Sequence, residues 1–394
     1  MSTTRQPSRT LILFDVDGVL VHPVGYKKAL HDTLDYFAAQ MGLGGLGLDD
    51  HEIGVFEACG ITNEWDSGAL CLSTILLAAL SERPDLRRAT LDETLAAVRA
   101  AGLRIARPDF TTLAREIVQR NTDHQVPAAL GLTLLADRTD AANLPLLSAL
   151  LGDVYSLETP TTRVFQTHTL GSEHFAAAYG QPAPLERESY LKTHDIPLLD
   201  AAHRDHLLQW AAQPGHGAVI FTARPSLPPA DLPDESGSGY APEAELAAEL
   251  VGLHGRLPLI ASGRVGWLAQ RNRRVVADYV KPSPVQALAA IGAAASGVES
   301  AALEAAADLY ERDILSGPLA ALAGGFTRVI VFEDAVPGIR AVQLAVERLR
   351  AAGLSIAFEG IGVSSHTDKR AALAEIAVHV VDDVNTGLDL ILTA

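Results

Sequence analysis

Two carboxylates at the end of an apolar run are the residues of this sequence best suited to chemistry. Leu11–Phe14 predicts a short buried strand, and Asp15, Asp17 and Gly18 follow it. Acids at the end of a buried strand are costly unless they face a cleft, a cation or a substrate. Ligands of open α/β sheets bind beyond the carboxyl ends of the strands, so this position suits a functional site. Taken alone, the segment could instead be a turn in which Gly18 supplies the bend.

A second apolar run also ends in acids. Arg328–Phe332 predicts a buried strand, and Glu333 and Asp334 follow it. Two acidic strand ends that meet in one cleft would repel each other unless a cation lay between them. Carboxylate oxygens without a histidine or cysteine cluster favour Mg²⁺ over Zn²⁺. The alternative is a polar strand end that caps the next helix.

Two further segments could bind a phosphoryl group. Thr222 ends the apolar run Ala218–Thr222, and Lys281 precedes a helix that begins at Pro284. A lysine and a metal ion would neutralise the equatorial oxygens of a phosphoryl group. A carboxylate can attack phosphorus, and a second acid two residues later could protonate the leaving oxygen and then activate water. Taken alone, Thr222 could be a cap residue and Lys281 an exposed lysine of a loop.

This ordered set resembles the haloacid dehalogenase-like (HAD) hydrolase superfamily. The segments that match, in the family's order, are Asp15–Val19, Thr222, Lys281 and Glu333–Ile339. The sequence looks like subfamily I with a helical C1-type cap, in the branch of phosphoglycolate phosphatase-like and β-phosphoglucomutase-like enzymes. It departs from the family pattern at Val280, where glycine is usual, and in the long stretch between Lys281 and Asp334.

The resemblance implies a role for each matching residue. Asp15 is the expected nucleophile, and Asp17 is the expected general acid and base. Asp17 also argues against a true dehalogenase, which lacks this second acid. The phosphoryl group is expected to bind to three residues, Thr222, Ala223 and Lys281. Mg²⁺ is expected to bind to four residues, Asp15, Asp17 through its backbone carbonyl, Glu333 and Asp334.

The order of the predicted elements favours an α/β protein with a Rossmann-like parallel sheet. Further strands are predicted at Ser355–Phe358 and Val378–Val381, and a weaker one at Leu257–Ala261 because it contains a proline. Helical patterns lie between most of these strands, so helices should cover both faces of the sheet. We also predict a surface loop over Pro225–Glu243 and an extra helix within Gly292–Gly325.

A long helical insertion interrupts this pattern directly after the first strand. We expect a core domain formed by residues 1–24 and 195–394, and a helical cap domain formed by residues 25–194. The insertion lies where the resembled family places its cap. A closing cap must read the substrate and exclude water, so the choice of substrate should reside there.

Two polar stretches of the insertion, Gly60–Asp66 and Val164–Gly171, are similar to cap motifs of a little-characterised phosphatase-like subgroup. The first predicts substrate contacts, and its alternative is a loop between helices with Trp65 as a buried packing anchor. At the hinge into the insertion, His22, Tyr26 and Lys27 could also contact substrate or could be solvated. The cap and hinge residues that we single out as candidates are His22, Thr62, Asn63 and Trp65.

Composition excludes several other classes of function. The net charge is −17, which disfavours a nucleic-acid partner because phosphate backbones need basic patches. No apolar run is long enough for a membrane span, and the polar first ten residues do not resemble a signal peptide. Two cysteines, Cys59 and Cys71, are expected to be thiols in a reducing cytosol, although one disulfide is possible.

The combined prediction is a cytoplasmic Mg²⁺-dependent phosphatase that acts on a small phosphorylated metabolite through an aspartyl-phosphate. A sugar phosphomutase of the β-phosphoglucomutase type would use the same residues. A non-catalytic protein that binds a phosphorylated ligand is the alternative from another class, although a binder does not need a second acid placed for proton transfer.

Overall fold

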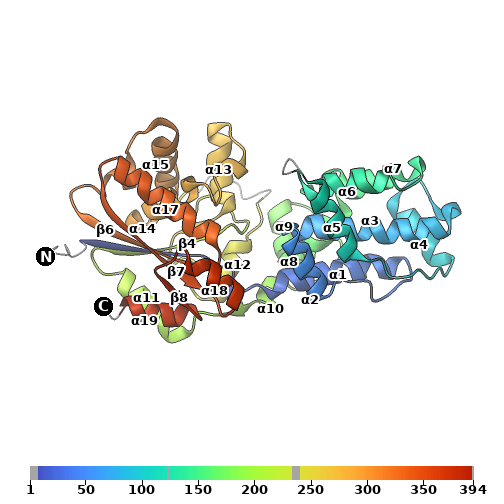
Figure 1. Cartoon of the computed structure of the whole chain (residues 1–394), viewed down its shortest axis with the longest axis horizontal. Helices are drawn as coiled ribbons and strands as arrows, with labels where there is room; N and C mark the ends of the chain where they lie inside the picture. Colours follow the sequence, from blue (N-terminus) through green and yellow to red (C-terminus); the bar gives the residue numbers. More distant parts are fainter. Residues whose placement is uncertain (1–7, 122–124, 233–239, 393–394) are drawn as a thin grey trace. The chain divides into compact units, whose positions relative to one another are not determined.

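The structure, a computed structural model, describes residues 8–121, 125–232 and 240–392. It divides into two compact units. The core unit comprises Met1–Pro23 and Asp195–Ala394, and the helical unit comprises Val24–His194. Both units are drawn in Figure 1. None of the described helices is both long and apolar enough to cross a membrane.

The core unit contains a six-stranded sheet in which every pair of neighbouring strands is parallel. The strands, in their order across the sheet, are β5 (Leu259–Ile260), β4 (His216–Phe221), β1 (Arg9–Phe14), β6 (Phe326–Glu333), β7 (Ser355–Val363) and β8 (His379–Val381). Phe14 of β1 is level with Ile220 of β4 and with Phe332 of β6. The carboxyl ends of these three strands therefore lie side by side at the middle of the sheet.

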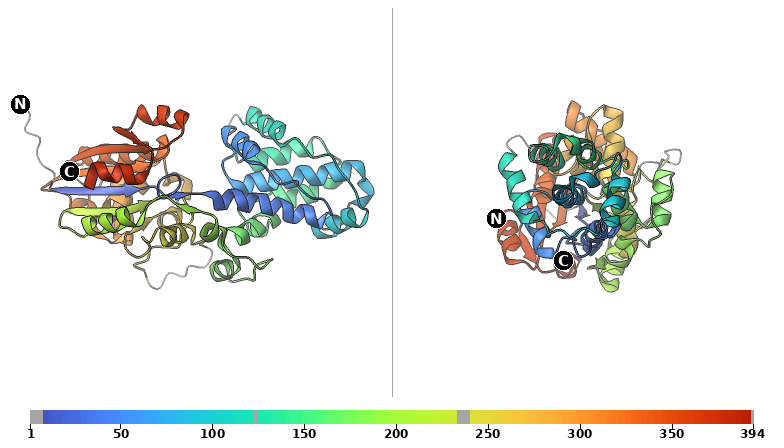
Figure 2. Two further views of the ribbon diagram at one scale, coloured as in Figure 1. Left: turned by 90° about the horizontal axis from the view of Figure 1, so that it is seen from below. Right: turned by 90° about the vertical axis from the view of Figure 1, so that its right-hand side faces the viewer.

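Alternate residues of each strand enter two separate apolar cores, one on each face of the sheet. Leu11 and Leu13 belong to the core covered by α13 (Ser262–Asn272), α14 (Pro284–Ser296), α15 (Glu299–Arg312), α16 (Gly317–Ala320), α17 (Val336–Ala351) and α18 (Thr367–Ala374). Ile12 and Phe14 belong to the core covered by α11 (Ala201–Ala211), α12 (Glu243–Leu250) and α19 (Val384–Leu392). Figure 2 shows helices on both sides of the strands. The predicted α/β parallel sheet with helices on both faces is confirmed.

The sequence predicted the edge strand and the connecting segments of the core unit less well than its central strands. The weak strand candidate is present as the short edge strand β5, where Pro258 precedes the paired residues. The stretch Gly292–Gly325 holds the end of α14 and two further helices, α15 and α16, instead of one.

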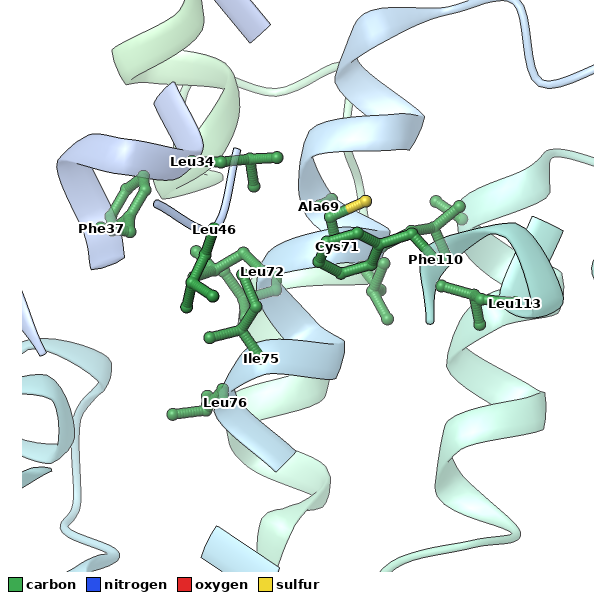
Figure 3. Close-up of a cluster of buried hydrophobic side chains, with 14 of the residues drawn as sticks. Leu34, Phe37, Leu46, Ala69, Cys71, Leu72, Ile75, Leu76, Phe110 and Leu113 are labelled. Carbon is green, nitrogen blue, oxygen red and sulfur yellow. The ribbon is translucent and has the colours of Figure 1, made fainter. Parts of the chain in front are cut away.

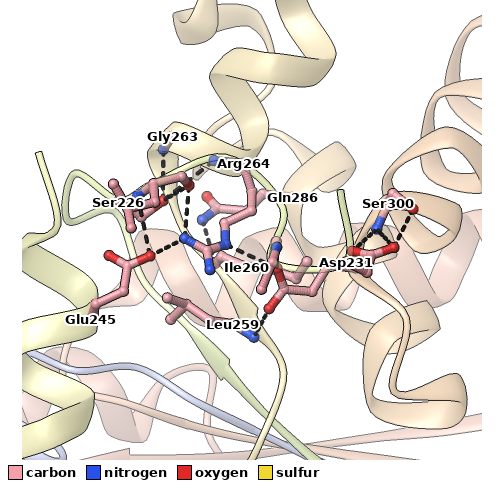
Figure 4. Close-up of polar contacts among 12 residues, drawn as sticks. Ser226, Asp231, Glu245, Leu259, Ile260, Gly263, Arg264, Gln286 and Ser300 are labelled. Atoms are coloured by element: carbon pink, nitrogen blue, oxygen red, sulfur yellow. Dashed lines mark hydrogen bonds and ion pairs between the residues drawn. The ribbon is translucent and has the colours of Figure 1, made fainter. Parts of the chain in front are cut away.

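Residues 225–232 of the expected surface loop after β4 form no helix or strand. Ser226, Pro228 and Pro229 are buried, whereas Ala230 and Asp231 are exposed. Residues 233–239 lie outside the described residues. A network of polar contacts holds this stretch (Figure 4). Arg264 is 3% exposed and binds the carboxylates of Glu245 and Glu299. Glu299 in turn accepts hydrogen bonds from the backbone N–H groups of Ala230 and Leu259, at 2.9 and 2.8 Å. The described part of the stretch is therefore a loop, as expected, but polar contacts hold part of its backbone against the core unit.

A short antiparallel ribbon marks both crossings between the core unit and the insertion. Strand β2 (Val21–His22) pairs with β3 (Ile196–Pro197). The chain leaves the core unit just after β2 and returns just before β3.

The helical unit is all-helical within the part of the chain that the structure describes. Its elements are α1 (Val24–Gln40), α2 (Asp50–Ala58), α3 (Glu64–Glu82), η1 (Pro84–Leu86), α4 (Leu91–Ala100), α5 (Phe110–Arg120), α6 (Pro127–Ala136), η2 (Ala141–Asn143), α7 (Leu144–Leu151), α8 (Pro160–Leu170), α9 (Ser172–Tyr179) and α10 (Tyr190–Thr193). Helix α3 is buried around most of its circumference, since every residue from Asp66 to Ser73 is buried. Its side chains meet Phe37 of α1 and Phe110 of α5 in one apolar cluster (Figure 3). Both cysteines are free, as expected.

Candidate active site

Three strand ends of the core unit bring the predicted chemistry together. Asp15 follows β1, and its backbone N–H donates a hydrogen bond to the carbonyl of Phe332 in β6 at 3.0 Å. Glu333 is the last residue of β6, and Thr222 directly follows β4. All three side chains are buried, with Asp15 the most accessible at 7%. These residues lie close together because they stand at the carboxyl ends of three neighbouring parallel strands.

Lys281 lies between two of the acids. Its Nζ is 2.8 Å from Oδ1 of Asp15 and 2.7 Å from Oε1 of Glu333. The same ammonium lies 4.2 Å from the centroid of the Phe221 ring, which adds a cation–π contact. Burial by itself lowers the pKa of Lys281, but the charges of Asp15 and Glu333 outweigh it and the net pKa is raised. Lys281 therefore stays positively charged beside the two carboxylates.

The environment of Asp15 disfavours its charged form, since it is a buried acid among other acids. Burial, and then the charges of Glu333 and Asp17, raise the pKa of Asp15 well above its usual value, while Lys281 opposes the rise. Lys281 therefore offsets only part of the cost that burial and the neighbouring acids impose on the ionised form of Asp15. An additional cation at the same place would lower the cost of the ionised form.

The acids do form a set of donors that such a cation could use. Asp15, Glu333 and Asp334 each offer a carboxylate oxygen, and these oxygens lie within 4.8 Å of one another. They are hard oxygen donors without nitrogen or sulfur among them, which suits Mg²⁺. The donor set therefore fits the metal that the sequence suggests.

Two glycines make room for these carboxylates. A Cβ atom at Gly18 would lie 2.6 Å from Oδ2 of Asp334, and the φ of +76° at Gly18 also disfavours a side chain. A Cβ atom at Gly338, in the first turn of α17, would lie 1.5 Å from Oε1 of Glu333. The glycines in the Asp-x-Asp-Gly and Glu-Asp-Ala-x-x-Gly segments are thus required by the close approach of the acids.

Thr222 is positioned by a side chain that sequence reasoning missed. Gln286 of α14 is fully buried, and its Nε2 donates to the backbone carbonyls of Thr222 at 2.7 Å and Ile260 at 3.1 Å. Its Oε1 accepts a hydrogen bond from the backbone N–H of Lys281 at 3.2 Å. Gln286 therefore links the two segments expected to bind the phosphoryl group. Ala223, the third residue of that expected set, is exposed.

Two other cations at the site were also missed. The guanidinium group of Arg224 binds the carboxylate of Asp17, with Nη2 2.6 Å from Oδ1. Nζ of Lys369, in α18, is 2.6 Å from Oδ2 of Asp334. Arg224 comes two residues after Thr222, so a charged residue that follows the predicted strand end was the available signal.

The candidates in the insertion and at the hinge are placed as follows. Thr62 is exposed, and Oδ1 of Asn63 accepts a hydrogen bond from the Trp65 N–H at 2.8 Å, so Asn63 caps α3. The Trp65 ring packs edge-on against Tyr155, with 5.5 Å between the ring centroids. His22, on β2, is exposed. Trp65 is half-buried, and substrate contact by this stretch stays a prediction.

Comparison with known proteins defines the fold only. No family model and no curated protein sequence matches the chain. The X-ray structure of Northeast Structural Genomics Consortium target ZR25 has a TM-score of 0.63 at 16% identity, over 96% of this chain and 97% of that chain.

Two other solved structures match less well. Phosphatase Tt82 from Thermococcus thioreducens has a TM-score of 0.48 at 16% identity, over 98% of this chain and 99% of that one. A HAD-superfamily hydrolase of subfamily IA from Geobacter sulfurreducens has a TM-score of 0.34 at 11% identity, over 99% of both chains. Only the first of the three scores indicates a shared fold.

Proposed function

We propose that this protein is a Mg²⁺-dependent phosphatase of the HAD-like superfamily that hydrolyses a small phosphorylated metabolite through an aspartyl-phosphate. The observation that carries the proposal is the buried Asp15 carboxylate, which meets Lys281 at 2.8 Å and shares a set of close carboxylate oxygens with Glu333 and Asp334. A site with a carboxylate nucleophile, a fixed ammonium and donors for a hard cation suits phosphoryl transfer, because that chemistry depends on positioning and charge neutralisation.

In the first step, a carboxylate oxygen of Asp15 attacks phosphorus, and the bond between phosphorus and the leaving oxygen breaks. The proton that this oxygen needs comes from the carboxyl group of Asp17. Lys281 stabilises the negative charge on the phosphoryl oxygens, and the hydroxyl of Thr222 donates a hydrogen bond to one of them. The products of this step are the free alcohol and phosphorylated Asp15.

In the second step, Asp17 acts as the base. Its carboxylate accepts a proton from a water molecule as the water oxygen attacks phosphorus. The phosphorus–oxygen bond to Asp15 then breaks, which releases inorganic phosphate and regenerates both carboxyl groups. Mg²⁺, bound by Asp15, Glu333, Asp334 and the backbone carbonyl of Asp17, would neutralise charge on the phosphoryl group in both steps.

The test is a panel of phosphorylated metabolites and generic phosphomonoesters, assayed for phosphate release with Mg²⁺ and with EDTA. The Asp15→Asn variant should lose at least about 10⁴-fold in turnover, because the nucleophile is removed. Asp313→Asn is the matched control, since this acid has an 86% exposed side chain and lies at the end of α15.

Three outcomes would contradict the proposal. Undiminished turnover by Asp15→Asn would rule out a mechanism through an aspartyl-phosphate at this residue. Conversion of a sugar 1-phosphate to its isomer without phosphate release would make the protein a mutase. Ligand binding that needs no Mg²⁺, with no turnover across the panel, would make it a binding protein.

A further inference from the structure

Arg224 is held rigidly at its backbone, directly beside the expected phosphoryl-binding residue Thr222. Its N–H donates a hydrogen bond to Oγ1 of Thr222 at 3.2 Å. Its carbonyl accepts hydrogen bonds from both the backbone N–H and the hydroxyl of Ser262, each at 3.1 Å. The residue is 3% exposed, so its long side chain extends through packed protein.

The guanidinium group of Arg224 binds two carboxylates that are far apart in sequence. Nε lies 3.0 and 3.1 Å from the two carboxylate oxygens of Asp17, and Nη2 lies 2.6 Å from Oδ1 of Asp17. The same Nη2 lies 3.0 Å from Oδ2 of Asp195. Two nitrogens of one planar group therefore fix the plane of the Asp17 carboxyl group, which a lysine ammonium could not do.

The two carboxylates differ in their exposure. The side chain of Asp195 is fully buried, whereas that of Asp17 is 36% exposed. Asp195 is the first residue of the core unit after the insertion and directly precedes β3. A buried arginine needs a buried counter-charge, and Asp195 supplies it. The contact with Asp17 is additional to that need, and it fixes an acid that is accessible to solvent.

We infer that Arg224 is a positioning residue that orients the Asp17 carboxyl group for proton transfer, and that Asp195 fixes Arg224 in turn. The inference rests on the proposed function, in which Asp17 gives its proton to the leaving oxygen as the phosphorus–oxygen bond breaks. Among the described residues, Oδ2 of Asp17 accepts only the bond of 3.1 Å from Nε of Arg224. That oxygen is therefore the less engaged of the two, and we assign the proton transfer to it.

The test uses substituted phenyl phosphates, which share a shape and differ in how much their leaving oxygen needs a proton. The value of kcat/KM reports the step in which Asp15 becomes phosphorylated and the leaving group departs. Arg224→Lys should lose roughly 10- to 100-fold more kcat/KM on p-methoxyphenyl phosphate than on p-nitrophenyl phosphate, since p-nitrophenolate departs without a proton. Asp195→Asn should also make kcat/KM depend more steeply on the leaving group, to a smaller extent than Arg224→Lys.

Two further variants separate positioning from simple destabilisation. Arg264→Lys makes the same change in a buried arginine that binds Glu245 and Glu299, and it should leave the leaving-group dependence unchanged (Figure 4). Asp17→Asn should steepen the dependence by itself. In that background, Arg224→Lys should change kcat/KM by less than about two-fold, because a residue that acts through Asp17 is not additive with its loss.

Each contrary outcome has a separate meaning. An equal loss on every phenyl phosphate would make Arg224 a structural or phosphate-binding residue and would overturn the inference while leaving the proposed function intact. Full additivity with Asp17→Asn would overturn it too. A wild-type protein that hydrolyses no phosphomonoester would overturn the proposed function, and the inference with it.

Discussion

The core unit and the helical unit differ in how some of their buried polar side chains are bound. In the core unit, Asp15 and Glu333 share the ammonium of Lys281, and Asp17 and Asp195 share the guanidinium of Arg224. Each shared cation joins segments that are distant in sequence, and the sheet brings them together.

In the helical unit, two buried polar side chains show the difference, since neither forms an ion pair among the described residues. Asp66, which is 1% exposed, accepts hydrogen bonds from the N–H of Ala128 and from the hydroxyl of Tyr155. His168, also 1% exposed, has no hydrogen-bond partner for either ring nitrogen. The difference teaches that convergence on one point, and not burial of polar groups alone, distinguishes the candidate active site.

Among three tests of this contrast, the largest expected effect comes from a pair of lysines. Lys281→Met should lower turnover by roughly 10²- to 10³-fold, because a fixed donor to the transferring group is lost. Lys28→Met is the matched change in the helical unit, where Nζ of Lys28 is 2.5 Å from Oδ1 of Asp32 but the lysine side chain is 40% exposed. We expect that variant to retain turnover within about two-fold, since an exposed pair contributes little. Steady-state kinetics measure both, and equal losses would break the comparison.

The next effect concerns metal binding. Mg²⁺ at one hundred times its Kd should raise the free energy of unfolding by about 2.7 kcal/mol, and Asp334→Asn should remove most of this gain. The helical unit also gathers potential ligand atoms within 4.8 Å of one another, from His31, Asp32 and Asp35. Asp35→Asn should leave the gain unchanged, because these groups are partly exposed and lie in the other unit. Urea unfolding with and without Mg²⁺ at constant ionic strength makes the measurement, and a loss of the gain in Asp35→Asn alone would reverse the assignment.

The smallest of the three effects is a loss of stability in acid. Burial, and then the charges of Arg187 and Lys28, lower the pKa of His168 from 6.5 to about 4, although Asp32 opposes the shift. Below pH 6.5 the unfolded chain takes up a proton that the folded protein does not, so stability falls until the pH reaches about 4. Between pH 7 and pH 5 the loss from this residue should be about 2 kcal/mol.

His168→Leu should remove this part of the acid sensitivity, and replacement of the exposed His51 by Gln should not.

The measurement uses tryptophan fluorescence. Trp65 lies in the helical unit, and the other two tryptophans, Trp210 and Trp267, lie in the core unit. Replacing those two by Phe makes Trp65 fluorescence report urea unfolding of the helical unit at each pH. An unchanged pH dependence in His168→Leu would show that this histidine does not carry the effect.

The sequence predicted the acids and Lys281 because each follows an apolar run or precedes a marked helix start. It did not predict Arg224, Gln286 or Lys369, since their partners are defined by side-chain direction and by contacts across the fold. Arg224, for example, binds Asp17, which is 207 residues away. The sequence shows Arg224 two residues after Thr222, but the neighbouring residues do not predict which acid its side chain will bind.

The elements of the fold were also predicted best where the signal is local in the sequence. Strands with continuous apolar runs were found because a buried parallel strand needs them. The stretch after β4 is a loop over residues 225–232, as its composition predicts, but composition did not predict that Glu245 and Glu299 bind its backbone. In the insertion, Asn63 of the polar stretch Gly60–Asp66 caps α3, and composition alone does not distinguish a helix cap from a substrate-binding residue.

The two-residue ribbon of β2 and β3 has a consequence for how this chain could have arisen. Val21 pairs with Pro197 and His22 with Ile196, so in topological terms the whole helical unit is the loop of a β-hairpin. Hairpin loops of very different lengths leave the flanking pairs intact, and each doubling of loop length adds only about 0.6 kcal/mol of closure entropy. The core could therefore accept, enlarge or exchange its insertion during evolution without a change in the register of its sheet.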